Sequence, residues 1–515
     1  MTSAVADVGH TTVDLGDLES LGYKQELHRG LGSFASFASG FSFVSILTTV
    51  FELFTFGFGL GGPAYFWTWP LVFTSQFSVA LTFAELSARY PISGAVYQWS
   101  RRVSSDPLGW MAGWLMLLGY IISVAALAIA LQLVLPPVWG GFQLVGGSSS
   151  PTSHTGAENA ILLGSICILI CMVISSAGVT KMAVLTRIGV SFEIVGVCAL
   201  VVLLFAHSVR GPGIVTHTNG VQGHGSYIGP FLASMLMAAY VFYGFDSAAE
   251  LSEETRDPRA TAPRAITRCM MVSAVGGGLL ILATLMAAPS LTNGDLATDG
   301  LAYVITSQLG NTLGKILLII VAISIFSATL AISASAARVM FSMSRDGRLP
   351  FARQLSYVSK RSKCPVLPGV MVSVLSIGVL LLNLGNTEVF AAVSSVAVVI
   401  VYLAYLMVTV PLLIKRLRGH YQPTTDATWT LGRFGLPVNI VAVIGGAFLM
   451  VNIGWPRVEV YDPGTPHWYL QYASPLFVVV AVSLGAIAYP LMKRQQSSSS
   501  GVIAPSDGAM GAPMA

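Results

Sequence analysis

Charged side chains are scarce in this sequence. Asp, Glu, Lys and Arg make up 10% of the 515 residues, whereas a soluble domain has about 25%. Hydrophobic residues make up 54% of the chain, so a soluble fold would have too few polar side chains to cover its surface. The composition therefore excludes a soluble globular protein and predicts an integral membrane protein.

Cysteine and histidine are also few, and neither forms a metal-binding pattern. The five cysteines include no C-x-x-C pair, and the eight histidines form no H-E-x-x-H motif. The sequence has no GxxxxGKS or GxxxxGKT loop, which an ATP-driven pump would need. The first thirty residues lack the basic start and short apolar core of a signal peptide. We therefore expect no metal, no cofactor, no enzymatic activity and no cleaved signal peptide.

Long apolar runs, by contrast, recur along the whole chain. About twenty helical residues cross the ~30 Å hydrocarbon core of a bilayer, and a helix satisfies its own backbone hydrogen bonds there. The alternating segments of about ten residues that build a membrane β-barrel are absent. We predict an all-α polytopic membrane protein with twelve transmembrane helices. They cover residues 34–58, 63–88, 108–134, 160–178, 184–207, 228–253, 265–288, 314–343, 366–384, 388–413, 436–454 and 472–492.

Basic residues are distributed unequally between the two sides that twelve spans define. Of the 27 Lys and Arg residues, all but Arg210, Lys315 and Arg457 fall on the side that holds both termini. Because cytoplasmic loops carry an excess of Lys and Arg, we predict a protein of the cell membrane with both termini cytoplasmic. The net charge of +4 then reflects topology, and we expect no nucleic-acid partner.

The first and sixth predicted spans contain small and polar residues at mid-depth. The first includes the hydroxyl-rich segment 39–49, SGFSFVSILTT, and the sixth includes 240–247, YVFYGFDS, with Gly244 and Asp246 inside the span. Interrupted helices at corresponding positions of two halves mark the substrate site of many secondary transporters. Close helix packing is the alternative explanation for small residues in one span. The occurrence in both spans favours a substrate site.

Four motifs occur in order along the chain. They are LGYKQEL at 21–27, AELSARYPISGAVY at 84–97, YGFD at 243–246 with EETRDP at 253–258, and RVMFSMSRDGRLP at 338–350. Together with the twelve spans they resemble the amino acid–polyamine–organocation transporters, and the first motif resembles the amino-acid/choline branch. The resemblance covers about residues 20–492.

The resemblance implies the leucine-transporter-like fold. Two inverted repeats of five helices, 34–207 and 228–413, would surround a central site, with two peripheral helices in 436–492. This transporter domain, 34–492, would follow a cytoplasmic N-terminal tail, 1–33. The Ser-, Gly- and Pro-rich segment 493–515 is predicted to be a disordered cytoplasmic tail.

The function that the resemblance implies is secondary active transport by alternating access. The expected substrates are amino acids or related small amines, such as γ-aminobutyrate, and the expected coupling is to protons, as in a symporter. A choline, ethanolamine or polyamine carrier remains an alternative, as does a gradient-independent amino-acid exchanger. The expected partners are therefore a small-molecule substrate, protons and the lipid bilayer.

The same resemblance assigns the substrate carboxylate to a break in the first helix. Backbone N–H groups at the start of its outer half would bind the anion, and the helix dipole would favour it. The residues that match this position are Ser45, Ile46, Leu47 and Thr48. Ser45 and Leu47 stand where most members of the family have glycine.

The substrate ammonium is assigned to a break in the sixth helix. Carbonyl groups at Tyr240, Val241 and Tyr243 would accept its hydrogen bonds, and Gly244 would permit the turn. Tyr240 matches an aromatic gate of the family, where a ring could also hold an ammonium by cation–π attraction. Simple packing against neighbouring helices is the alternative for these aromatic residues.

Coupling requires a group that binds and releases a cation. Glu193 lies inside the fifth span, where a carboxylate is costly unless it is paired or protonated, and it matches a position where some relatives carry lysine. It is the proton-coupling candidate, with a structural hydrogen bond as the alternative. Ser327 and Thr329 in the eighth span are cation-site candidates, although such hydroxyls often bond to their own helix.

Further acidic residues are predicted to form an inner gate. Asp246, Glu250 and Glu254 recur every four residues, so they share one helix face. We expect them to pair with cytoplasmic arginines, with Tyr240 as the aromatic part of the gate. Glu85, near the inner end of the second span, is expected to have a similar role.

Overall fold

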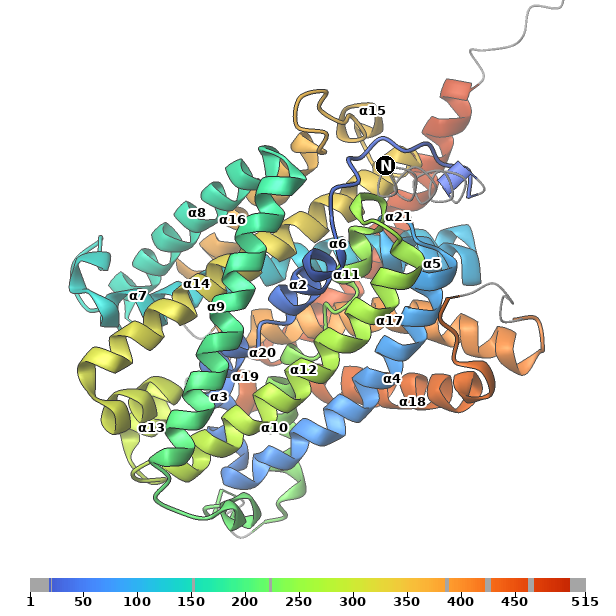
Figure 1. Ribbon diagram of the computed structural model, residues 1–515. Helices are drawn as coiled ribbons and strands as arrows, with labels where there is room; N and C mark the ends of the chain where they lie inside the picture. Colours follow the sequence, from blue (N-terminus) through green and yellow to red (C-terminus); the bar gives the residue numbers. More distant parts are fainter. Residues whose placement is uncertain are drawn as a thin grey trace, which may run out of the picture.

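The computed structural model is built from helices (Figure 1). It describes residues 18–19, 21–150, 153–221, 225–384, 389–421, 428–461 and 467–500. Within these ranges, a single isolated β-bridge joins Leu31 and Thr255. The longer helices are α2 (Ser33–Val44), α3 (Ile46–Gly61), α4 (Thr68–Arg89), α5 (Ala95–Val103), α6 (Asp106–Ile129), α7 (Leu131–Val138), α8 (His154–Ser176), α9 (Val179–Ala206), α10 (Ile228–Val241), α12 (Pro258–Ala287), α14 (Leu301–Arg345), α16 (Val366–Leu380), α17 (Val389–Leu417), α18 (Gly435–Gly454) and α21 (Ala473–Ser500). The short ones include α11 (Ser247–Glu250), α13 (Gly294–Asp299), α15 (Ala352–Leu355), α19 (Val458–Tyr461) and α20 (Trp468–Gln471).

Ten helical stretches of the described chain are long and apolar enough to cross a membrane. They correspond to α2 with α3, α4 with its preceding turn, α6 with α7, and then α8, α9, α12, α14, α17, α18 and α21. The helices α10 and α16 are apolar but shorter. Taken in chain order, these ten stretches and two shorter helices correspond to the twelve predicted spans, although α10 covers only residues 228–241 of the sixth span, 228–253. The predicted all-α polytopic membrane fold is therefore confirmed.

Large apolar side chains cover the outside of the bundle. Val195 and Val202 of α9, Ile444 of α18 and Val479 of α21 are all exposed. Exposed apolar surface of this extent is unfavourable in water and matches a hydrocarbon environment. The polar side chains of the predicted site, by contrast, are buried inside the bundle, among them Ser45, Thr48 and Glu193.

Glycine and proline residues mark several helix ends. Gly178 (φ 126°) separates α8 from α9, so that the chain reverses within a few residues. Pro258 occupies the first turn of α12, where its missing N–H costs nothing. Gly310 (φ 76°) divides α14 into a short first segment and a long membrane-spanning segment. The short segment falls within 290–313, where the sequence is polar.

The first and last described segments of the chain lie at the same end of the bundle. In Figure 1 the N-terminal segment, α15 and the end of α21 are together at the top, and α13 lies at the opposite end. This arrangement agrees with an even number of spans. The helix α21 continues to Ser500, past the predicted start of the disordered tail at residue 493. The rest of that tail, 501–515, and most of the predicted tail 1–33 lie outside the described residues.

Candidate functional site

A single residue, Ser45, breaks the first predicted span. It adopts a left-handed conformation (φ 33°, ψ 82°), α2 ends before it, and α3 begins after it. A left-handed serine costs about 1–2 kcal/mol, so the surrounding contacts must stabilise it. Helical hydrogen bonding resumes at Thr49, whose N–H donates to the Ser45 carbonyl at 3.0 Å. The N–H groups of Ile46, Leu47 and Thr48 therefore lie in the first turn of α3, without intrahelical acceptors.

The carboxylate of Glu193 occupies this helix start. Glu193 is fully buried on α9, and its Oε1 accepts a hydrogen bond from the Leu47 N–H at 3.2 Å. The hydroxyl of Ser45 lies 3.0 Å from the same oxygen and 2.7 Å from Thr48 Oγ1, so its one hydrogen can donate to either. The other carboxylate oxygen of Glu193, Oε2, is buried without a hydrogen-bond partner.

A longer break interrupts the sixth span, where α10 ends at Val241 and α11 begins at Ser247. Gly244 has φ 79°, and a methyl group at its Cα would overlap the ring of Phe43 on α2. Glycine is therefore required here both by backbone conformation and by space. The Gly244 N–H donates to the hydroxyl of Tyr405 on α17 at 2.9 Å.

The two breaks lie beside each other. Phe43, two residues before Ser45, packs edge-on against Tyr243, with ring centroids 5.8 Å apart. Tyr243 in turn packs edge-on against Tyr240 at 5.4 Å, and its hydroxyl lies 2.7 Å from Ser123 Oγ on α6. All eight predicted substrate-binding residues are thus buried at these two breaks. They are Ser45, Ile46, Leu47, Thr48, Tyr240, Val241, Tyr243 and Gly244.

Tyrosines, not arginines, surround Asp246. Its carboxylate accepts hydrogen bonds from the hydroxyls of Tyr120 (2.6 Å) and Tyr405. Glu250 accepts the N–H of Gly94 at 2.8 Å, and its Oε1 has no hydrogen-bond partner. The arginine pairing predicted for these two acids is therefore not found in the described structure. The reason is that α11 is short and turns into the protein interior, among tyrosines and backbone N–H groups.

Ion pairs follow directly after α11. Glu254 and Arg338 are both buried and form two hydrogen bonds of 3.1 Å, as predicted for Glu254. Glu253 pairs in the same way with Arg345, with two hydrogen bonds of 2.8 Å. Such two-point pairs fix the relative position of both partners. They connect the segment after α11 to the end of α14.

Two further ion pairs strengthen the same end of the bundle. Arg101 of α5 contacts Asp346 at 2.6 Å, and Tyr97 donates to the same carboxylate at 2.7 Å. Burial, followed by the nearby Asp346 charge, raises the pKa of Tyr97, so this hydroxyl stays a donor. Glu85 on α4 pairs with Arg416 of α17, in agreement with its predicted role.

The two cation-site candidates differ in their contacts. Ser327 lies 2.8 Å from the Ser42 hydroxyl on α2 and next to Gly189, one helical turn from Glu193. Thr329 donates to the carbonyl of Ile325 in its own helix at 2.8 Å. Ser327 therefore contacts α2 and lies beside α9, the helix of Glu193, whereas Thr329 is hydrogen-bonded within its own helix. The described residues contain no group of three or more His, Cys, Asp or Glu side chains placed to hold a metal ion.

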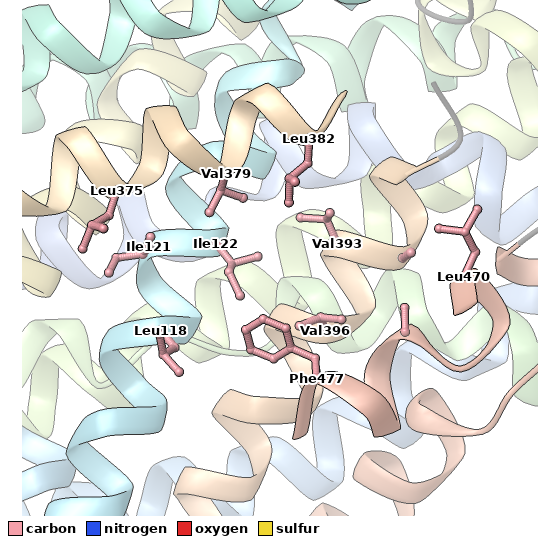
Figure 2. Close-up of a pocket in the computed structure, with 12 residues that line it drawn as sticks. Leu118, Ile121, Ile122, Leu375, Val379, Leu382, Val393, Val396, Leu470 and Phe477 are labelled. Carbon is pink, nitrogen blue, oxygen red and sulfur yellow. The ribbon is translucent and has the colours of Figure 1, made fainter. Parts of the chain in front are cut away.

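An apolar pocket is lined by none of these residues. Figure 2 shows it between α6, α16, α17 and α21, with side chains such as Ile122, Val379 and Phe477 pointing into it. Every residue that lines it is apolar. Because an amino acid needs hydrogen-bond partners for its two charged groups, this pocket is not a site for one.

The sequence is similar to known membrane carriers over most of its length. The family model described as amino acid permease matches residues 31–482. Amino-acid permease BAT1 of Arabidopsis thaliana is 28% identical over 463 residues, which cover 85% of this chain and 88% of the relative. The BAT1 homolog of Oryza sativa subsp. japonica is 26% identical over 503 residues, 93% of each chain. Amino-acid permease 2 of Neurospora crassa is 25% identical over 500 residues, 93% of this chain and 88% of the relative.

Proposed function

The chain belongs to the amino acid permease family, and we propose that it is a secondary active transporter that carries amino acids across the cell membrane together with protons. The contact between Glu193 and the Leu47 N–H is the observation that carries this proposal. The similar proteins are named amino-acid permeases, which supports amino-acid transport in general.

The two adjacent breaks supply complementary groups for a zwitterion. In this proposal the N–H groups of residues 46–48 receive the substrate carboxylate, because the start of α3 carries the positive end of its dipole. The carbonyl groups around Tyr240, Val241 and Tyr243, at the negative end of α10, receive the ammonium. Gly244 shapes the turn that presents them, as its left-handed backbone requires.

Glu193 links proton binding to substrate binding. As a carboxylate it satisfies the Leu47 N–H, which a substrate carboxylate would also need. Two anions at one N–H repel each other, so protonation of Glu193 would release this donor to the substrate. The hydrogen-bond donors to the carboxyl group are the Ser45 hydroxyl and the Leu47 N–H, and no charged side chain of the described residues pairs with it. Substrate and proton would therefore bind with positive coupling.

The ion pairs after α11 are proposed to close the cytoplasmic path. Arg338–Glu254 and Arg345–Glu253 tie the segment after the second break to α14, so its movement requires them to separate. Tyr240, Asp246 and Glu250 are proposed to move with this gate. The excess of basic residues supports the assignment of this end, and of both termini, to the cytoplasm.

Uptake of labelled amino acids into proteoliposomes tests the proposed function. We expect saturable uptake that an inward proton gradient accelerates, and we expect Glu193→Gln to remove that acceleration while amino-acid exchange persists. γ-Aminobutyrate, choline and putrescine serve as comparison substrates. Uptake of choline or putrescine alone would contradict the substrate assignment, and uptake indifferent to the gradient would contradict proton coupling.

A further inference from the structure

A second buried carboxylate, Glu52, lies on α3 beyond the break. The side chain is 5% exposed, and both of its oxygens are buried without a hydrogen-bond partner. This distinguishes it from Glu193, Glu253 and Glu254, each of which has at least one oxygen hydrogen-bonded. A carboxylate inside a membrane span without a partner is expensive, which makes Glu52 a candidate for a function in binding.

Two uncharged polar groups accompany Glu52. The hydroxyls of Tyr240 on α10 and Ser394 on α17 are also buried without a hydrogen-bond partner. Glu52 lies close enough to Tyr240 and Tyr243 to act on both electrostatically, and Ser394 lies beside Tyr240. Three helices thus supply one carboxylate and two hydroxyls: Tyr240 lies against the Ser394 and Tyr243 hydroxyls, and neither oxygen of Glu52 has a hydrogen-bond partner. Such a set fits a ligand that donates hydrogen bonds and carries positive charge.

The position of Glu52 relates it to the carboxylate site at the break. Residues 45, 48 and 52 follow the i, i+3, i+7 pattern, so Ser45, just before α3, and Thr48 and Glu52, within α3, lie on the same side of the helix. Along the helix axis, Glu52 lies about 6 Å beyond Thr48, since each residue rises 1.5 Å. This separation is comparable to the reach of a basic side chain with its flexible carbon stem.

We propose that Glu52, Tyr240 and Ser394 form a subsite for the cationic end of a basic amino acid, so that arginine, lysine and ornithine are the preferred substrates. The inference rests on the proposed function, because it places the substrate carboxylate at residues 46–48. Glu52 supplies the counter-charge, the two hydroxyls accept hydrogen bonds, and the Tyr240 ring offers a cation–π contact.

Comparison of charged substrates with their neutral isosteres tests the subsite. Binding to the purified full-length protein is measured for arginine against citrulline and for lysine against norleucine. We expect arginine to bind at least about tenfold more tightly than citrulline, since a buried charge pair is lost with citrulline. In Glu52→Gln the ratio should fall to about one, because arginine loses its counter-charge and its binding weakens at least about tenfold. Glu158→Gln, on the partly exposed surface of α8, is the matched control and should keep the wild-type ratio.

Several results would overturn the inference. Equal binding of arginine and citrulline by the wild type would do so without any variant, whether or not Glu52→Gln folds. An unchanged ratio of arginine to citrulline affinity in Glu52→Gln would also overturn the inference. A change in Glu52→Gln that affects only the pH dependence of transport would overturn it too. Cadaverine binding as tightly as lysine would exclude the amino-acid class. If neutral amino acids are carried but no charge preference exists, only the Glu52 subsite fails; if no amino acid binds, the proposed function fails too.

Discussion

The Glu193 carboxylate accepts the backbone N–H of Leu47 at 3.2 Å, across the interface between α9 and α3. A side chain of the protein thereby binds the same kind of donor that a substrate carboxylate would need. In the proposed mechanism, this contact makes Glu193 the residue that couples proton binding to substrate binding. The same contact stabilises the start of α3, because an anion near a helix N-terminus is favourable by about 0.3–1 kcal/mol.

Gly244→Ala should damage both stability and transport. The residue has φ 79°, and a methyl group would overlap the Phe43 ring, so we expect a loss of roughly 1–3 kcal/mol of stability. Thermal unfolding in detergent measures the first effect, and uptake measures the second. Gly229→Ala in α10 is the matched control, because nothing lies within 4 Å of its added methyl group. Equal melting temperatures for the two variants would contradict this account of the second break.

Tyr405→Phe should be more harmful than Tyr120→Phe. Both substitutions remove a hydrogen bond to Asp246, but Tyr405 also accepts the Gly244 N–H. A buried polar group left unpaired costs about 1–3 kcal/mol of stability. Tyr405→Phe removes a hydrogen bond from two such groups, the Asp246 carboxylate and the Gly244 N–H. Thermal unfolding of the two single variants gives the order directly. The reverse order would show that the Tyr405 hydroxyl does not support the break.

Replacing one residue of the Arg338–Glu254 pair should destabilise the protein more than replacing both. Each side chain is buried, so Arg338→Met alone leaves an uncompensated carboxylate, at a cost of about 3–5 kcal/mol. Adding Glu254→Gln removes that charge and should restore part of the stability. Melting temperatures of both single variants and the double variant form the cycle that measures this coupling. Additive losses would mean that the two residues stabilise the protein independently.

Much of the fold could be predicted from the sequence, for a physical reason. The span count, the helical class and the sites of both breaks follow from apolar length and from polar residues such as Ser45, Gly244 and Asp246 at mid-depth. Apolar length and polar residues at mid-depth are properties of single segments, because each segment that crosses the bilayer must meet the same requirements on its own.

Contacts between helices could not be predicted in the same way. The sequence marks Glu193 as an intramembrane carboxylate, but its contact with Leu47 depends on how α9 packs against α3. The prediction that Asp246 pairs with arginine was wrong, because its carboxylate accepts hydrogen bonds from Tyr120 and Tyr405, which lie far away in sequence. Those tyrosines are polar residues within apolar spans, and that signal could have drawn attention to them. Thr329, bonded to its own helix, shows that a polar residue in a span is not always part of a site.

The most direct test of proton-coupled transport is to measure proton entry into proteoliposomes when an amino acid is added outside, with a pH-sensitive dye trapped inside. The account predicts that the amino acid causes internal acidification with the wild type and with Glu158→Gln. Glu193→Gln should cause none, although it still exchanges labelled amino acid. Amino-acid uptake by the wild type without acidification, or wild-type acidification by Glu193→Gln, would contradict the account.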